Sequence, residues 1–170
     1  MGGIVSDSTV IMALAKAGLM EAALRLPHEF IIPDVMFEDE LLDLAEYTRD
    51  DLIQAGLRRA ALNSHGVRLA YRYAADYHNL HTSDCFALAL VKTAEVAWLL
   101  TANVSLSNIA VSKGIETRDL LWLCDEMNDH ETVGSRLLHD ALVQLDEDPL
   151  VWLPRSELSR RIQRLAGIPV

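Results

Sequence analysis

The chain has 170 residues, of which 51% are hydrophobic and 24% are charged. This length and composition fit one domain with a buried core and exclude an intrinsically disordered protein. The net charge of −10 excludes nucleic-acid binding through a broad basic surface, because such binding depends on many Lys and Arg contacts to phosphate.

The amino-terminal half of the chain predicts an alternation of short strands and helices. We expect strands at residues 3–5 and 30–32, and helices at residues 8–19, 35–47 and 64–78. Thr48 and Asp51 resemble a capping box in which Asp replaces the usual Glu. Residues 52–62 allow two interpretations, a continuous helix or a turn at Gly56 followed by a strand.

The alternation continues in the carboxyl-terminal half. We expect a helix over 84–94 that is capped by Thr82 or Ser83, a core strand over 96–101, a helix over 105–113 and a last strand beginning at Ile115. Further helices are predicted at 119–128, 132–146 and 156–165. This order is typical of an α/β fold with a central parallel sheet. We predict one domain over residues 1–148 and a helical tail over 149–170.

Two features of the sequence bear on its compartment. It lacks an apolar run of the ~20 residues that a membrane-spanning helix requires, and its first residues do not resemble a secretory signal. Cys85 and Cys124 both lie in apolar helical segments, which predicts buried thiols rather than a disulfide. We therefore expect a cytoplasmic protein without membrane contact.

Polar residues follow four of the apolar segments. Asp7 follows the first strand, an acidic run that ends at Glu40 follows the second, Asp84 opens an apolar helix, and Asn103 follows the core strand. Acids at the carboxyl ends of parallel strands converge on one edge of the sheet. They would repel one another there unless they held a hard cation such as Mg²⁺. The pattern therefore predicts a metal-dependent hydrolase.

These motifs resemble those of a known family. Ile-Val-x-Asp-Ser-Thr, Ile-Ile-Pro with an acidic helix, Thr-Ser-Asp and Leu-Leu-Thr-x-Asn occur in this order over roughly residues 4–128. The series looks like a PIN domain, a family that includes VapC-type toxin ribonucleases. The resemblance implies a three-layer α/β/α fold with extra carboxyl-terminal helices here. It also implies Mg²⁺- or Mn²⁺-dependent cleavage of RNA.

By this resemblance Asp7, Glu40 and Asp84 are the metal ligands. Capping of a helix, or interaction with a helix dipole, would also explain Asp7 and Asp84 without a metal. Glu38 is a rival to Glu40, and on a continuous helix the two would point about 200° apart, so only one can face the site. The motif favours Glu40, whereas Glu38 lies closer to the apolar stripe expected at residues 41, 42 and 45.

Asn103 departs from the family pattern, which expects a fourth carboxylate at this position. An amide oxygen is a weaker ligand for a hard cation, so the substitution predicts weaker metal binding. Asn103 nevertheless remains a candidate catalytic position. Ser8, Thr101 and Ser105 are candidates for positioning substrate or water.

The sequence thus predicts a ribonuclease, with the toxin of a toxin–antitoxin pair as one form. Its partners would be RNA, an antitoxin-like basic protein and a second copy in a homodimer. The alternative is a catalytically weakened PIN fold that binds a protein or RNA without cleavage. A phosphatase of the haloacid dehalogenase type is disfavoured, because it needs a second aspartate where Thr9 stands.

Overall fold

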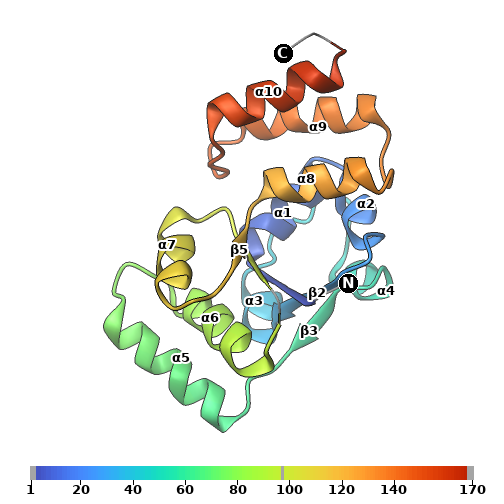
Figure 1. Ribbon diagram of the computed structural model, residues 1–170. Coiled ribbons are helices and arrows are strands. Elements are labelled where there is room, and N and C mark those ends of the chain that lie inside the picture. Colours follow the sequence, from blue (N-terminus) through green and yellow to red (C-terminus); the bar gives the residue numbers. More distant parts are fainter. Residues whose placement is uncertain (1–2, 97, 168–170) are drawn as a thin grey trace.

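The computed structural model describes residues 3–96 and 98–167 and is built on a five-stranded parallel sheet (Figure 1). The strands follow the spatial order β3-β2-β1-β4-β5. Their bounds are Gly3–Ser6 for β1, Glu29–Pro33 for β2, Arg58–Ala60 for β3, Trp98–Leu100 for β4 and Thr117–Arg118 for β5. All four pairings are parallel, which confirms the predicted sheet.

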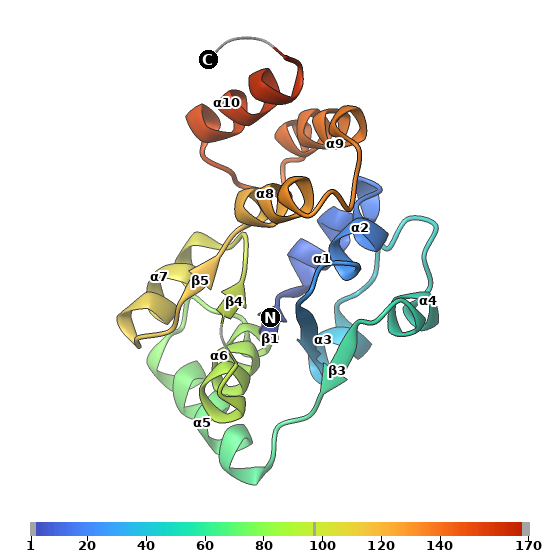
Figure 2. The same cartoon turned by 45° about the vertical axis from the view of Figure 1, so that its right-hand side comes forward.

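Helices cover both faces of this sheet. The described residues form α1 (Ser8–Lys16), α2 (Met20–Leu24), α3 (Asp34–Asp39), α4 (Arg49–Gln54), α5 (Ser64–Asp76), α6 (Thr82–Ala94), α7 (Val104–Ser112), α8 (Leu120–Asp129), α9 (Ser135–Glu147) and α10 (Arg155–Leu165). Figures 1 and 2 show α1, α2 and α8 on one side of the sheet and α3, α5 and α6 on the other. The three-layer α/β/α fold is therefore confirmed.

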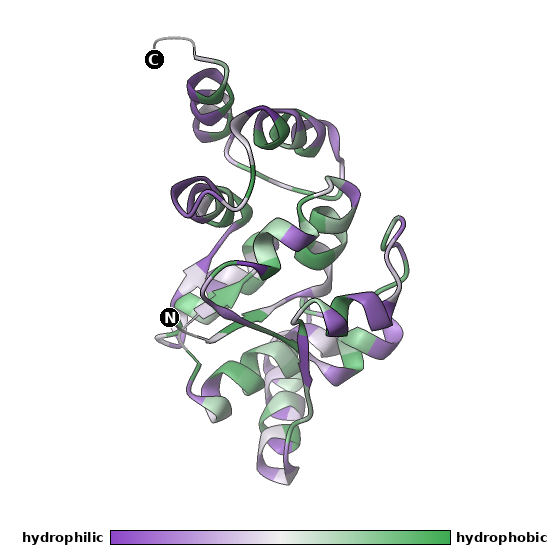
Figure 3. Cartoon of the chain, turned by 90° about the vertical axis from the view of Figure 1, so that its right-hand side faces the viewer, coloured by the Kyte–Doolittle hydropathy of each residue, from purple (hydrophilic) through white to green (hydrophobic). Residues whose placement is uncertain are grey.

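The hydrophobic core lies between the sheet and the helices on its two faces. Ile4, Val5, Leu99 and Leu100 on the two central strands are completely buried, as expected for a parallel sheet with both faces covered. Figure 3 shows apolar residues on the strands and on the inward helix faces, with polar residues outside. The strand order reverses between β1 and β4, and open α/β folds place their sites beside such a reversal, at the carboxyl ends of the strands.

The helix predicted over 35–47 is too long, because α3 ends at Asp39. The Arg49 guanidinium donates to the carbonyl oxygens of Phe37 (Nε, 3.0 Å) and Glu38 (Nη2, 3.1 Å). These carbonyls would otherwise accept the amides that continue the helix, so Arg49 satisfies its carboxyl end from outside. In the loop that follows, Leu41 is buried and Leu42 is 80% exposed, so the apolar stripe expected there does not form.

The ambiguous segment 52–62 contains both a helix end and a strand. After α4 the chain turns at Gly56, whose φ of +116° is a backbone conformation that favours glycine, and continues as β3. The capping box before α4 is confirmed: the Thr48 hydroxyl accepts from the Asp51 amide at 3.1 Å, and the Asp51 carboxylate accepts from the Thr48 amide at 2.8 Å.

In the carboxyl-terminal half, one helix cap and the bounds of two strands differ from those predicted. The cap of α6 is His81, not Thr82 or Ser83, which lie in its first turn. The core strand expected over 96–101 corresponds to β4, and Ala97 lies outside the described residues. The last strand begins at Thr117, because the Ile115 amide still donates to Ala110 at the end of α7.

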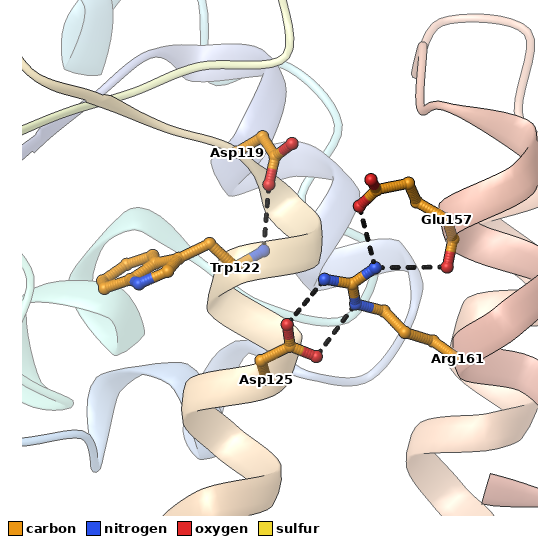
Figure 4. A network of polar contacts seen from close by, with 5 residues as sticks. All are labelled: Asp119, Trp122, Asp125, Glu157 and Arg161. Carbon is orange, nitrogen blue, oxygen red and sulfur yellow. Dashed lines mark hydrogen bonds and ion pairs between the residues drawn. The ribbon is translucent and has the colours of Figure 1, made fainter. Parts of the chain in front are cut away.

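The last helix is attached to the core by an ion pair. The Arg161 guanidinium on α10 binds both carboxylate oxygens of Asp125 on α8, at 2.9 and 2.7 Å, and also donates to Glu157 (Figure 4). Such planar two-point contacts fix geometry as well as adding energy. The domain boundary at residue 148 stays a prediction.

Two findings bear on the predicted compartment. Among the described helices, none has the length and apolar character needed to cross a bilayer. Cys85 and Cys124 are buried free thiols, as predicted, and burial raises their pKa to about 11 and about 12. The thiols are therefore protonated at neutral pH.

Candidate metal centre at the carboxyl edge of the sheet

Asp7 lies where β1 meets α1, beside the strand-order reversal. Its Oδ1 accepts from the Val10 amide at 2.9 Å, which caps α1. Its Oδ2 accepts from the hydroxyl of Thr101 at the end of β4. The capping role considered for Asp7 is therefore real, but it occupies only one oxygen, and the other faces the neighbouring strand.

The carboxyl group of Asp7 is held in an unfavourable environment. The residue is only 3% exposed, and burial raises its pKa from 3.8 to about 6, against the opposing effect of the hydrogen bonds from Thr101 and Val10. The negative charge of Asp84 raises this pKa further. Asp7 thus carries a charge at neutral pH that its surroundings only partly stabilise.

Asp84 stands at the start of α6 and is also buried, with 7% of its surface exposed. Its Oδ2 accepts from the His81 amide at 3.2 Å. Burial raises the pKa of Asp84, and the charge of Glu40 adds to this effect, while the amide and the charge of His81 oppose it. Asp84 is therefore coupled electrostatically both to Asp7 and to Glu40.

Glu40 follows α3 and reaches the same region. Ser8 donates its hydroxyl to Oε2 at 2.8 Å, and Ser83 donates to Oε1. Ser8 opens α1 directly after Asp7, and Ser83 precedes Asp84, so Glu40 is oriented by the immediate neighbours of both aspartates. Ser83 was assigned to helix capping from the sequence, and its role in holding Glu40 depends on a contact between distant segments.

Glu38 points elsewhere. Its carboxylate forms an exposed ion pair with Arg59 on β3. Since β3 is the outermost strand beyond β2, this pair lies away from the β1–β4 junction. The geometry thus supports Glu40 over Glu38 as the glutamate of the site.

Asn103 caps α7 and is linked to Asp7 through one residue. Its Oδ1 accepts from the Leu106 amide at 3.2 Å, and its own amide donates to the Thr101 hydroxyl at 2.9 Å. Thr101 in turn donates to Asp7. Ser105 is exposed on α7 and has no hydrogen bond to these acids in the described part of the chain, so the structure does not bring it into the group.

The chemistry of these side chains fits a hard divalent cation. Asp7, Glu40 and Asp84 offer only oxygen atoms, which Mg²⁺ and Mn²⁺ prefer. Among residues 3–96 and 98–167, none of the three is paired with a Lys or Arg. Hydrogen bonds and the charge of His81 therefore offset the raised pKa values of Asp7 and Asp84 only in part. In the same residues no three acidic, His or Cys side chains converge closely enough to hold an ion as they stand.

Two grooves adjoin the acids. The Glu40 groove is lined by Glu40 and Ser83 together with His81, Tyr71 and Phe86. The Asn103 groove is lined by Thr101 and Asn103 together with Asn108, Asp119, Trp152 and Pro154. The sequence did not single out Asp119, Trp152 or Tyr71, which line these grooves.

The raised pKa of Asp7 predicts a measurable effect on stability. Between about pH 4 and pH 6 the unfolded chain releases this proton more readily than the folded protein, so the contribution of Asp7 to stability falls as the pH rises through this window. We expect Asp7→Asn to stabilise the metal-free protein at pH 7.5 by about 1–3 kcal/mol, with part of the gain offset by weaker hydrogen bonds. At pH 4 the difference should be much smaller.

Urea unfolding in EDTA at the two pH values measures this effect. Asp39→Asn is the matched control, because Asp39 is an exposed acid that lines the Glu40 groove, and its loss should change stability little. Equal stability of Asp7→Asn and the parent at pH 7.5 would contradict the argument.

Comparison with known proteins supplies the last observation. A family model described as a PIN domain matches residues 3–167, which is nearly the whole chain. No curated protein and no solved structure matches the chain significantly. The family match agrees with the parallel sheet and with the acids at its carboxyl edge. The chain therefore belongs to the PIN-domain family and has the fold of a nuclease.

Proposed function

We propose that this protein is a metal-dependent ribonuclease of the PIN type, which hydrolyses phosphodiester bonds in RNA with Mg²⁺ or Mn²⁺. The observation that carries the proposal is the burial of Asp7 and Asp84, two electrostatically coupled carboxylates with raised pKa values and without a Lys or Arg partner among the described residues. Such an arrangement is costly unless a cation occupies it.

The contacts of the side chains suggest two roles, ion binding for the acids and orientation of those acids for the hydroxyl groups. Asp7, Asp84 and Glu40 would hold the ion. A bound divalent cation supplies an activated water and offsets the charge that develops on the phosphate. The Thr101 hydroxyl keeps one oxygen of Asp7 aimed at the β1–β4 junction, and Ser8 and Ser83 orient Glu40.

These hydroxyl contacts also preserve negative charge. A hydroxyl donor orients a carboxylate without neutralising it, whereas a Lys or Arg partner would compete with the ion. Neutral pH is about one unit above the pKa of Asp7, which is about 6. In most molecules Asp7 therefore carries the negative charge that metal binding needs.

The central test is calorimetric titration with Mn²⁺, paired with an assay on RNA of mixed sequence. We expect Asp7→Asn and Asp84→Asn each to abolish Mn²⁺ binding and cleavage, because each removes one buried ligand, while circular dichroism shows an intact fold. In both variants the amide oxygen can still accept the backbone hydrogen bond. Either variant binding Mn²⁺ as tightly as the parent would rule out the shared site.

A second titration compares the two glutamates. Glu40→Gln should weaken Mn²⁺ binding by roughly tenfold or more, because Glu40 is held beside both aspartates. Glu38→Gln should change it by less than about twofold, because Glu38 is paired with Arg59. The reverse order would assign the ligand to Glu38.

A third titration tests the missing carboxylate. Asn103→Asp should strengthen Mn²⁺ binding and raise cleavage, because Asp can cap α7 equally well and adds a charge next to Thr101 and Asp7. Asn108→Asp is the control, since it adds the same charge to the same groove but is not linked to Thr101. Equal metal affinities in the two variants would mean that Asn103 does not face the ion.

A further inference from the structure

A pocket among the carboxyl-terminal helices lies apart from the acidic edge of the sheet. It has a volume of about 180 Å³ and is lined by side chains of α8, α9 and α10. Figures 1 and 2 show these three helices together at the end of the molecule opposite α5. None of the described residues that line this pocket also lines the Glu40 groove or the Asn103 groove. The pocket is therefore a separate candidate site.

The floor of the pocket is apolar and belongs to the hydrophobic core. Leu138 and Leu142 of α9 and Cys124 of α8 are each at most 1% exposed, and the half-buried Leu165 of α10 adds a fourth apolar side chain. The thiol of Cys124 is uncharged at neutral pH, because burial raises its pKa to about 12. A floor of this kind favours the apolar part of a ligand, since binding removes apolar surface from water.

The charged residues of the pocket include one arginine without an acidic partner. Arg161 binds both carboxylate oxygens of Asp125 and also contacts Glu157 (Figure 4). Arg164 lies three residues further along α10 and is exposed. In the described part of the chain its guanidinium forms neither an ion pair nor a hydrogen bond. Because Asp125 is already bound by Arg161, an anion for Arg164 has to come from outside the pocket.

Two neutral polar side chains accompany Arg164 in the lining. Asn128 of α8 and Ser135 of α9 are exposed, and neither side chain makes a hydrogen bond within residues 3–96 and 98–167. An amide and a hydroxyl can both donate to a carboxylate oxygen, and a guanidinium can do so with two parallel N–H groups. Each of the three helices thus supplies one donor above a shared apolar floor.

We infer that this pocket binds a small monocarboxylic acid, whose carboxylate pairs with Arg164 and whose compact apolar body contacts Leu138 and Leu142. The combination of an apolar floor with a few polar groups is typical of pockets for small molecules. None of the acids at the sheet edge takes part, so the site is independent of the proposed function.

The volume and the charges of the pocket define the class of acid. A cavity of about 150 Å³ can hold benzene, so a volume of about 180 Å³ matches an aromatic or branched acid of similar size. A ligand with two negative charges fits less well, because Asp125 and Glu157 already bring two carboxylates to Arg161. A single carboxylate balances the one unpaired guanidinium.

The test is NMR spectroscopy of the full chain in EDTA, with isotope-labelled leucine methyl groups. The probe is benzoate, and the matched controls are benzamide, which lacks the charge, and acetate, which lacks the ring. We expect benzoate to shift the methyl signals of Leu138 and Leu142 with a Kd of about 0.1–1 mM. Benzamide and acetate should bind at least about fivefold more weakly, because each lacks one of the two recognised parts.

Two variants locate the contacts of the probe. Arg164→Gln should weaken benzoate binding about threefold or more and leave benzamide binding unchanged, because only the charged ligand loses a partner. Arg160→Gln is the matched control, since Arg160 is exposed on the same helix but does not line the pocket. Asn128→Trp should abolish binding of benzoate by filling the pocket, and the exposure of Asn128 leaves the core undisturbed.

Two results would overturn the inference. One is the absence of shifts at Leu138 and Leu142 when benzoate is present well above the expected Kd. The other is a loss of selectivity, either as equal affinity of the parent for benzoate and benzamide or as equal affinity of Arg164→Gln and the parent for benzoate. Neither result bears on the proposed function, because the titrations contain no RNA and no divalent ion.

Discussion

The hydrogen bond from Thr101 to Asp7 joins the two strands at which the order of the sheet reverses. β1 and β4 pair with Ser6 opposite Leu100, and the Asp7 amide donates to the Leu100 carbonyl at 3.1 Å. The side chains that follow the strands then meet directly. Because Asp7 also caps α1, and Thr101 also accepts the Asn103 amide, this contact sets the starting points of both α1 and α7. The rest of the site is built around it.

Three acidic side chains lie around this junction, and no Lys or Arg of the described residues pairs with them. The side-chain donors to the three acids are hydroxyls, and backbone amides supply further hydrogen bonds. The arginines of the neighbouring elements are used elsewhere, with Arg49 on the carboxyl end of α3, Arg59 on Glu38 and Arg161 on Asp125. Burial and the repulsion between these acids are unfavourable for the charged carboxylates, and they raise the pKa values of Asp7 and Asp84. A site that traded this repulsion for salt bridges would be more stable but less able to take an ion.

The parts of the site that could be predicted from sequence are those set by local pattern. Asp7, Asp84 and Asn103 each stand at a boundary between an apolar run and a helix, so their placement at one sheet edge follows from the alternation of strands and helices. The motif favoured Glu40 over Glu38, and Ser8 and Ser83 do hold Glu40 near both aspartates. The helical geometry used to compare the two glutamates was wrong, because α3 ends at Asp39. The carbonyls of Phe37 and Glu38 near the end of α3 are satisfied by Arg49, which is distant in sequence and meets them only in the folded chain. The hydrogen bond from Ser83 to Glu40 was missed for the same reason, since it joins segments that are distant in the sequence.

Because α3 ends just before Glu40, the loop that follows can change in evolution without moving this glutamate. Glu40 is fixed from both sides, by the helix before it and by the serines that hold its carboxylate. The loop after it returns to the core through Leu41 and Leu44, while Leu42 and Ala45 face outward. Extra residues inserted near Ala45 would therefore lengthen an exposed connection at a cost that grows only slowly with length. The three acids can therefore stay constant while this loop diverges, so that the protein can gain a new surface beside an unchanged edge of the sheet.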